Sequence, residues 1–166
     1  MIDPGKRWIS CDPARGPSGL TFWEGENIEH VLTIKKRGNK GKYYCGSGIV
    51  DSMLEAWNGC LAWAAGSTVI IEKGAGNRPN VIDAHGFMRG YIQHECDTIG
   101  ATLRVVNVST WRRCCVEAYG VSWPTGREAK KALSVRLAKE KFGIECSDDE
   151  SDSIFVGVAA IRMGLV

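Results

Sequence analysis

Thr68-Val69-Ile70-Ile71-Glu72 is the stretch that decides the fold class: an unbroken β-branched run that ends in a carboxylate. Such a run is typical of a strand covered on both faces, as in the parallel sheets of α/β proteins. On either side, over residues 48–65 and 81–99, apolar residues recur at helical spacing. A strand between two helices predicts a crossover unit within a parallel part of a sheet.

Upstream of this unit, three short runs have the composition of strands, and turns rich in glycine and proline separate them. The runs are Trp8–Cys11, Leu20–Trp23 and Ile28–Ile34. Their tight spacing predicts an antiparallel meander. Residues 35–42 contain five basic side chains, two glycines and no acid, and we expect a solvated loop there.

Downstream, residues 103–108 form a second apolar strand, and three helices are predicted over residues 110–119, 124–142 and 147–163. The expected fold is therefore a mixed α/β domain. Its five-stranded sheet would combine the antiparallel meander with two parallel strands, and helices would cover both faces. At 166 residues, we expect the chain to form one domain over residues 1–166.

Composition excludes several classes of protein. With 44% hydrophobic and 24% charged residues, the chain has the composition of a folded protein rather than a disordered one. It has no run of 18 apolar residues, which argues against a membrane-spanning helix. The first ten residues lack the apolar segment of a secretory signal, so we expect a cytoplasmic protein. None of the seven cysteines forms a CxxC pair, which indicates reduced, buried thiols. The net charge of +2 implies no partner by itself.

Four acids are candidate ligand-binding residues because of their positions in the predicted elements. Asp12 ends the first strand, Glu72 ends the buried strand, and Asp149 and Asp152 share one face of the last helix. If they converge, their hard oxygen donors suit Mg²⁺ or Mn²⁺. Two such ions about 4 Å apart would activate a water and stabilise the leaving oxygen of a phosphodiester. The set therefore predicts metal-dependent phosphodiester hydrolysis.

Glu72 and the acids of the last helix also have a plain structural interpretation. Ser147 and Glu150 match a helix-capping box, and acids in a first turn suit the helix dipole. Glu72 alone could be a solvated strand end. Among Asp148, Asp149 and Glu150, the three-residue offset from Asp152 favours Asp149, and Asp148 is the alternative.

These motifs, in this order, resemble those of the RuvC-type Holliday-junction resolvases, which have the ribonuclease-H-like fold. The likeness covers residues 8–163: a strand ending in Asp12-Pro13, a strand ending in Glu72, a helix opening Asp149-x-x-Asp152, and residues 85–90 (HGFMRG), similar to the family's L-G-x-x-R-G. It implies that Asp12, Glu72, Asp149 and Asp152 are catalytic residues that bind two Mg²⁺ or Mn²⁺ ions. The short chain looks more like phage-type members. Asp3-Pro4 imitates the opening motif, but no strand precedes it.

The same resemblance places a basic helix, residues 127–141, where the family approaches DNA, with Lys130 as the candidate phosphate contact. Phosphate binding there would offset the repulsion between the acids and the DNA backbone. The further candidates for DNA binding are Lys131, Arg112, Arg113, Arg89 and Lys73. A solvated helix face explains part of this charge equally well.

The predicted function is a structure-selective endonuclease that resolves four-way and possibly other branched DNA junctions, in a bacterial or phage-infected cell. Because a four-way junction has two-fold symmetry, we expect a homodimer, with Gly86, Met88 and Gly90 in its contact. One alternative is a branched-DNA-binding module that does not cleave. The others are an RNA/DNA-hybrid ribonuclease or a flap nuclease on the same fold.

Overall fold

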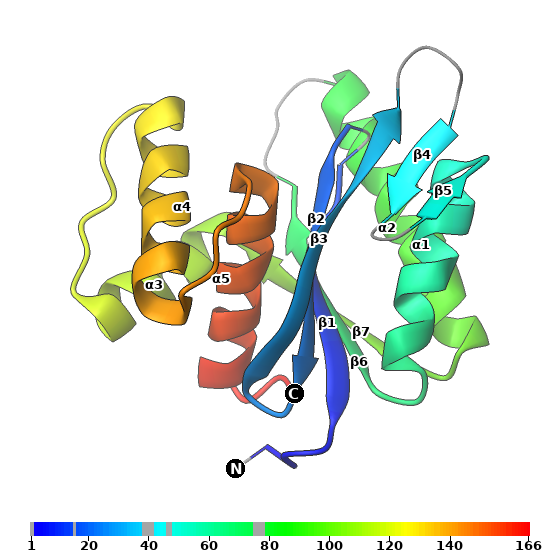
Figure 1. Cartoon of the computed structure of the whole chain (residues 1–166), viewed down its shortest axis with the longest axis horizontal. Helices are drawn as coiled ribbons and strands as arrows, with labels where there is room; N and C mark the ends of the chain where they lie inside the picture. The colour runs from blue at the N-terminus through cyan, green and yellow to red at the C-terminus, as the bar shows by residue number, and fades with distance from the viewer. Residues whose placement is uncertain (1, 15, 38–41, 46–47, 75–78) are drawn as a thin grey trace.

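The computed structural model describes residues 2–14, 16–37, 42–45, 48–74 and 79–166. Within these residues, seven strands form a mixed sheet in the order β5-β4-β3-β2-β1-β6-β7, with helices on both faces (Figure 1). The strands are β1 (Arg7–Asp12), β2 (Ser18–Glu24), β3 (Asn27–Arg37), β4 (Lys42–Cys45), β5 (Gly48–Val50), β6 (Thr68–Lys73) and β7 (Thr102–Asn107).

The pairing of the strands brings three carboxyl ends to one edge of the sheet. β1, β2 and β3 form the antiparallel meander, whereas β1–β6 and β6–β7 are parallel pairs. In parallel strands the carboxyl ends meet at the same edge, where α/β proteins bind ligands. Asp12 and Glu72 both lie at this edge. The mixed sheet predicted from the sequence is therefore confirmed.

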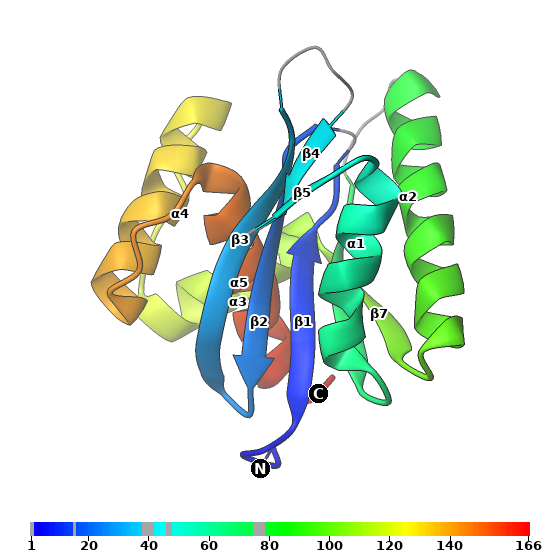
Figure 2. The ribbon, with the colours of Figure 1, turned by 45° about the vertical axis from the view of Figure 1, so that its right-hand side comes forward.

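Two helical layers cover the sheet (Figure 2). The helices α1 (Met53–Leu61) and α2 (Pro79–Thr98) lie on one face, and α3 (Val108–Tyr119), α4 (Arg127–Phe142) and α5 (Asp148–Arg162) lie on the other. Successive side chains of β1 point to opposite faces of the sheet. Ile9 and Cys11 therefore pack in the core under α1 and α2, and Trp8 packs in the core under α5. No helix in the described parts of the chain is long and apolar enough to span a bilayer.

The predicted five strands are all present, but the count of five was wrong. The short strands β4 and β5 extend the sheet beyond β3. Residues 48–50, predicted as the start of a helix, form β5, and α1 begins only at Met53, where the Ser52 side chain accepts a hydrogen bond from the Glu55 backbone N–H. Over only three residues, the sequence pattern of a strand cannot be told from that of a helix.

Two further expectations need adjustment. The basic stretch 35–42 is not all loop, since β3 continues to Arg37 and β4 starts at Lys42; residues 38–41 lie outside the described residues. Met88, predicted at a dimer contact, is fully buried in the chain's own core. Of the six cysteines whose side chains are described, five are buried, as predicted, and Cys146 is half-buried.

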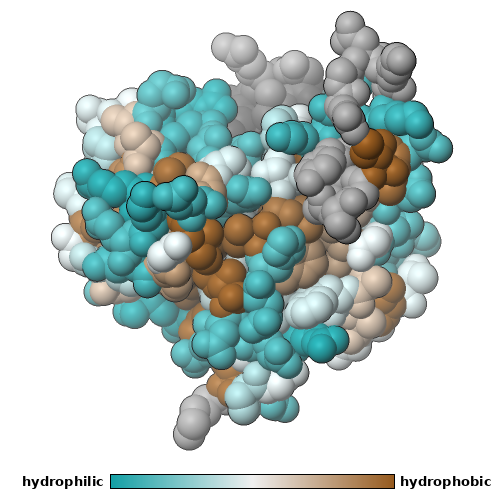
Figure 3. Space-filling model, in the orientation of Figure 1, coloured by the Kyte–Doolittle hydropathy of each residue, from teal (hydrophilic) through white to brown (hydrophobic). Residues whose placement is uncertain are grey.

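The face of the molecule seen in Figure 3 has hydrophilic and hydrophobic regions. Hydrophilic residues prevail over the side where α4 lies, and hydrophobic residues show through near the centre of the view. The basic residues predicted to bind DNA on α4 therefore lie on a hydrophilic side of the molecule.

Candidate active site

The four predicted acids line one cavity of about 630 Å³ at the carboxyl ends of β1 and β6. The acids come from three separate elements: Asp12 from β1, Glu72 from β6, and Asp149 and Asp152 from the start of α5. The rest of the lining is mostly basic or small, and consists of Gly74, His85, Val108, Arg112, Gly126, Arg127, Lys130 and Lys131.

A glycine lets the start of α5 approach Asp12. Asp12 is paired in the sheet with Gly19 of β2. A Cβ atom built on Gly19 would lie 1.9 Å from the carbonyl oxygen of Asp149, far inside van der Waals contact. Only a residue without a side chain allows this approach. Gly19 thus brings the Asp149 backbone against the strand pair that carries Asp12.

Buried hydrogen bonds set the position of α5 along the sheet. Ser10 of β1 donates from Oγ to the carbonyl of Ser153 at 2.7 Å, and Trp23 Nε1 donates to the same Ser10 Oγ at 2.7 Å. The Thr21 and Ser153 hydroxyls lie 2.7 Å apart in a further hydrogen bond. Because all of these side chains are buried, each bond is costly to break without replacement. Ser153 thus anchors the helix one turn after Asp149.

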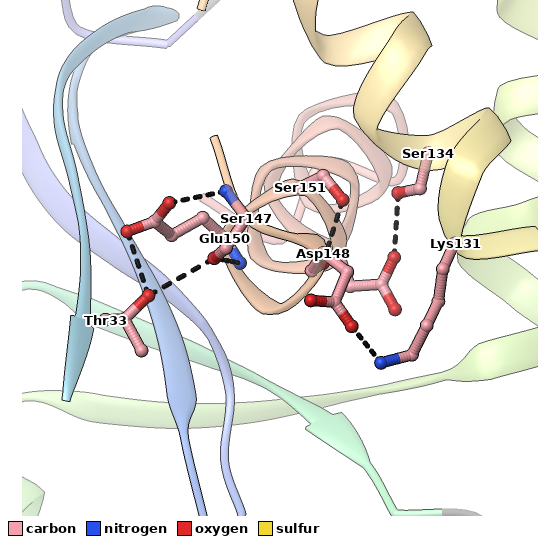
Figure 4. Close-up of polar contacts among 8 residues, drawn as sticks. Thr33, Lys131, Ser134, Ser147, Asp148, Glu150 and Ser151 are labelled. Carbon is pink, nitrogen blue, oxygen red and sulfur yellow. Dashed lines mark hydrogen bonds and ion pairs between the residues drawn. The ribbon is translucent and has the colours of Figure 1, made fainter. Parts of the chain in front are cut away.

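The other acids of the first turn have different partners (Figure 4). Asp148 pairs with Lys131 of α4. Glu150 accepts from the Ser147 backbone N–H at 2.8 Å and from the Thr33 hydroxyl at 2.9 Å. The Ser147 hydroxyl accepts in return from the Glu150 backbone N–H, which completes the predicted capping box. Of the three first-turn acids, Asp149 is the one that lines the cavity.

Two donors from the helical layer hold the cavity carboxylates. Trp111 of α3, fully buried, donates from Nε1 to Glu72 Oε2 at 2.7 Å. Ser134 of α4, also buried, donates from Oγ to Asp152 Oδ1 at 2.7 Å. Charge-assisted hydrogen bonds of this kind orient a carboxylate as well as stabilise its ionised form.

Arg112 faces the acids from a position between two indole rings. Its guanidinium carbon lies 5.0 Å from the centre of the Trp111 ring and 5.4 Å from that of Trp123. Its Nε is buried and has no hydrogen-bond partner among the described residues. The charge of Arg112 lowers the pKa of both Glu72 and Asp152. Arg112 therefore acts as an internal cation of the cavity wall.

Burial disfavours ionisation of the cavity acids, although four cations also line the cavity. Burial, then the charges of Glu72, Asp152 and Asp149, raise the pKa of Asp12 well above its usual value, and Lys131 only partly opposes them. Burial also raises the pKa of Glu72 to about 7, against the Trp111 hydrogen bond. The pKa values of Asp149 and Asp152 rise as well, mainly through burial. A bound cation would stabilise the ionised forms of these buried carboxylates.

The donor set fits a hard divalent metal ion. Four carboxylates with no thiol or amine among them suit Mg²⁺ or Mn²⁺. Within the described residues, however, no three His, Cys, Asp or Glu side chains lie close enough together to hold one ion as placed. The acids surround the cavity rather than meet at one point, as expected for like charges that repel each other.

The predicted DNA-binding residues divide into three groups. Lys130, Lys131 and Arg112 line the acidic cavity. Lys73 and Arg89 line a neighbouring cavity. Arg113 lines neither; it is exposed and its Nε lies 3.8 Å from Glu117 one turn further along α3.

Four residues with a role at the cavity were not predicted from the sequence. His85 and Arg127 line the cavity, and Trp111 and Ser134 donate hydrogen bonds to its carboxylates. Arg127 opens the basic helix, so the charge pattern could have included it. His85 fits because Gly74 has no side chain; a Cβ there would lie 2.2 Å from the His85 ring. Nothing local marks Trp111 or Ser134, because their partners belong to other elements.

Comparison with known proteins supports the fold at low sequence identity. No protein-family model matches the sequence, and no curated protein matches it. RuvC of T. thermophilus in complex with a Holliday junction substrate matches with a TM-score of 0.61 and 10% identity, over 95% of this chain and 96% of that chain. A Thermus thermophilus RuvC structure matches with a TM-score of 0.57 and 13% identity, over 95% and 96%.

The yeast mitochondrial Holliday junction resolvase Ydc2 matches with a TM-score of 0.53 and 13% identity, over 98% of this chain and 80% of that chain. All three matches span nearly the whole of this chain. The predicted resemblance to the RuvC-type resolvases is thus confirmed at the level of the fold.

Proposed function

We propose that residues 1–166 form one nuclease domain that cuts four-way and other branched DNA junctions with the help of divalent metal ions. The observation that carries the proposal is the cavity in which acids from β1, β6 and α5 gather beside basic residues of α3 and α4. The fold supports it, since the RuvC-type structures share it and one of them was solved with a Holliday junction substrate.

Asp12, Glu72, Asp149 and Asp152 would hold two Mg²⁺ or Mn²⁺ ions. Such ions, when bound, activate a water and stabilise the leaving oxygen of a phosphodiester. The raised pKa values of Asp12 and Glu72 support this assignment, because a bound cation would stabilise their ionised forms.

The remaining residues of the cavity orient and balance these acids. Trp111 holds Glu72 and Ser134 holds Asp152, each by a hydrogen bond of 2.7 Å. Such bonds fix the direction of a carboxylate before a ligand arrives, as an efficient site requires. Arg112 supplies permanent positive charge, since a guanidinium stays protonated at any physiological pH.

Lys130 and Lys131 would bind the phosphates that flank the cleaved one. Both line the cavity from α4 on the side away from the sheet. Lys131 also pairs with Asp148, so its charge is partly used within the protein, whereas Lys130 has no such ion pair among the described residues. Lys73 and Arg89 would extend the contact along the strand.

A homodimer would place two such sites symmetrically about the two-fold axis of a junction. The exposed apolar side chains of α1 and α2, among them Leu54, Ile82 and Phe87, support a protein contact on that face. Gly86 and Gly90 of α2 are exposed, with no atom within 4 Å of a Cβ built on either, and would allow close helix packing.

Two other functions fit the same fold. A non-cleaving branched-DNA-binding module would not need four acids around one cavity, and their gathering favours an enzyme. An RNA/DNA-hybrid ribonuclease or a flap nuclease would use the same acids, so only a comparison of substrates separates them from a resolvase.

The deciding experiment incubates the pure protein with a labelled four-way junction, a flap, a linear duplex and an RNA/DNA hybrid, each with and without Mg²⁺. We expect paired nicks in the junction that require metal. Asp12→Asn should abolish the nicks and leave junction binding intact. Asp3→Asn is the matched control, because Asp3 also precedes a proline but is exposed and lies outside the cavity.

Three outcomes would contradict the proposal. Cleavage of the hybrid alone would make the protein a ribonuclease, and junction binding without any cleavage would make it a binding module. Equal cleavage by the Asp12→Asn variant and the Asp3→Asn variant would remove Asp12 from the site.

A further inference from the structure

The ion pair between Lys131 of α4 and Asp148, the first residue of α5, is partly shielded from water. Its two side chains are 29% and 34% exposed. In each of the other four ion pairs that the described residues form, both side chains are more than half exposed. Exposed pairs contribute little, because water and salt screen their charges. The Lys131 pair therefore has the surroundings in which the position of a charge matters.

Lys131 lies near several acids besides its partner. It lines the acidic cavity, whereas Asp148 does not. Burial raises the pKa values of Asp12, Asp149 and Asp152, and the charge of Lys131 lowers all three. An opposite charge has this effect on a carboxyl group when it lies nearby. The Lys131 ammonium is therefore close to the cavity acids, although its ion pair is with an acid outside the cavity.

Helix geometry makes Asp148 and Asp152 alternative partners for this lysine. The two acids are four residues apart on α5 and so lie one turn apart on one face. Lys131 and Ser134 are three residues apart on α4; Lys131 pairs with Asp148, and Ser134 donates to Asp152 at 2.7 Å (Figure 4). The lysine stem has four flexible carbons, so rotation about its bonds would carry the ammonium from Asp148 towards the cavity.

An ammonium among the cavity acids would compete with a metal ion. It has a positive charge and three N–H donors, which carboxylate oxygens accept. Because the protein chain tethers it, its effective concentration at the acids would be high. A divalent ion would have to displace it before binding. Metal binding therefore benefits from a group that holds the lysine back.

We propose that Asp148 is a positioning residue, which holds the Lys131 ammonium at the cavity wall and keeps it out of the place of a metal ion. The inference rests on the proposed function and adds to it a residue that controls how readily the acids take up metal. Asp148 is suited to this because it lies outside the cavity, so its ion pair leaves Asp149 and Asp152 available. The competing explanation is purely structural: an acid in the first turn stabilises a helix through its dipole.

Four substitutions separate these explanations. Asp148→Asn keeps the size of the side chain and removes its charge, and Asp148→Glu keeps the charge. Lys131→Met keeps an unbranched stem without an ammonium. Glu145→Gln is the matched control, because Glu145 forms the other ion pair between α4 and the residues at the start of α5, with Lys139 at 2.6 Å, and lies outside the cavity.

The first measurement titrates the metal-free variants with Mg²⁺ in a calorimeter, without DNA. Asp148→Asn should weaken Mg²⁺ binding about tenfold, a coupling typical of residues in contact. Asp148→Glu and Glu145→Gln should bind Mg²⁺ like the wild type. In the Lys131→Met background, Asp148→Asn should change the affinity by less than about twofold, because no ammonium remains to compete. An equal loss in both backgrounds would overturn the proposal, since Asp148 would then act as a metal ligand or through its charge alone.

The second measurement needs neither metal nor DNA. Crystal structures of the wild type and Asp148→Asn, both grown in EDTA, locate the Lys131 ammonium directly. We expect Nζ beside Asp148 in the wild type, and within hydrogen-bond distance of Asp149 or Asp152 in the variant. An ammonium that stays at position 148 or turns to solvent in the variant would overturn the proposal.

The two measurements also separate this inference from the proposed function. If the wild type binds no Mg²⁺, the two-metal assignment fails, and the crystal structures alone decide whether Asp148 positions Lys131. If both measurements give the expected results but the wild type cuts no junction, the positioning role stands and the resolvase proposal fails.

Discussion

Trp111 Nε1 donates a 2.7 Å hydrogen bond to Glu72 Oε2 and so ties the second turn of α3 to the end of β6. The bond matters because burial raises the pKa of Glu72 to about 7, and this donor is the strongest influence that lowers it. A carboxylate must be ionised to bind a metal ion. The indole therefore widens the pH range in which Glu72 is available.

Replacing Trp111 by phenylalanine keeps an aromatic ring but removes the donor. We expect the pKa of Glu72 to rise by about one unit, from the loss of a charge-assisted hydrogen bond. The acid limb of the pH profile for Mg²⁺-dependent cleavage should move up by the same amount. Trp57→Phe is the control, because the buried Trp57 Nε1 has no hydrogen-bond partner among the described residues. A profile that moves equally in both variants would contradict this role for Trp111.

The stability of the metal-free protein should fall as the pH rises. Glu72 binds its proton more tightly in the folded chain, with a pKa of about 7 against a usual value of 4.5. Its contribution to stability is therefore fully present below pH 4.5 and is lost as the pH rises through 7, by up to about 3 kcal/mol. Urea unfolding in EDTA from pH 5 to 8 measures this loss, and Glu72→Gln should reduce it. An identical pH dependence in the variant would show that the pKa of Glu72 is not raised by burial.

Mg²⁺ should raise the melting temperature of the wild type. An ion that binds only the folded state at ten times its dissociation constant adds about 1.4 kcal/mol of stability. Asp12→Asn should raise the melting temperature without metal, since it removes a buried charge repelled by Glu72, Asp152 and Asp149, and should shrink the effect of Mg²⁺. Asp3→Asn should behave like the wild type. No change of melting temperature at millimolar Mg²⁺ would argue against metal binding by these acids.

Gly19→Ala should destabilise the fold and displace the start of α5. The new Cβ would lie 1.9 Å from the Asp149 carbonyl oxygen, and backbone must move to relieve the overlap. We expect a loss of about 3 kcal/mol in the free energy of unfolding, at the upper end for overpacking. Gly16→Ala is the control, because a Cβ there meets no atom within 4 Å. Equal stability of the two variants would show that α5 does not depend on this close approach.

Lys130→Ala should lower the salt dependence of junction binding. Each phosphate neutralised by a cation contributes about 0.9 to the slope of log K against log salt, so the slope should change by about one. Lys141→Ala is the control on the same helix, since Lys141 lies over the ring of Tyr119, outside the cavity. If both variants change the slope alike, α4 binds DNA along its length rather than at the cavity.

Much of the fold could be predicted because its signals are local. The β-branched run of β6 needs no neighbour to be recognised as a buried strand. The hairpin of β4 and β5 was missed because pairing with β3, not its own pattern, makes these short segments strands. The capping signal Ser52-x-x-Glu55 was present, however, and could have placed the start of α1 correctly.

The candidate site divides in the same way. Asp12 and Glu72 could be singled out because each ends a strand, and Asp149 and Asp152 because a three-residue offset puts both on one helix face. The effects of Trp111 and Arg112 on the pKa values of these acids were not predicted. Their effect comes from indole and guanidinium positions relative to a strand about 40 residues away in the chain.

The sequence by itself determined the order of the elements, the mixed sheet and the placement of acids at strand ends, because backbone preference and side-chain periodicity act over a few neighbouring residues. The three-residue offset from Asp152 already favoured Asp149, but only the packing of α5 turns that face of the helix towards the cavity. That orientation depends on how α5 sits on the sheet, through Gly19 and a hydrogen bond between Ser10 and Ser153, which are 143 positions apart in the chain.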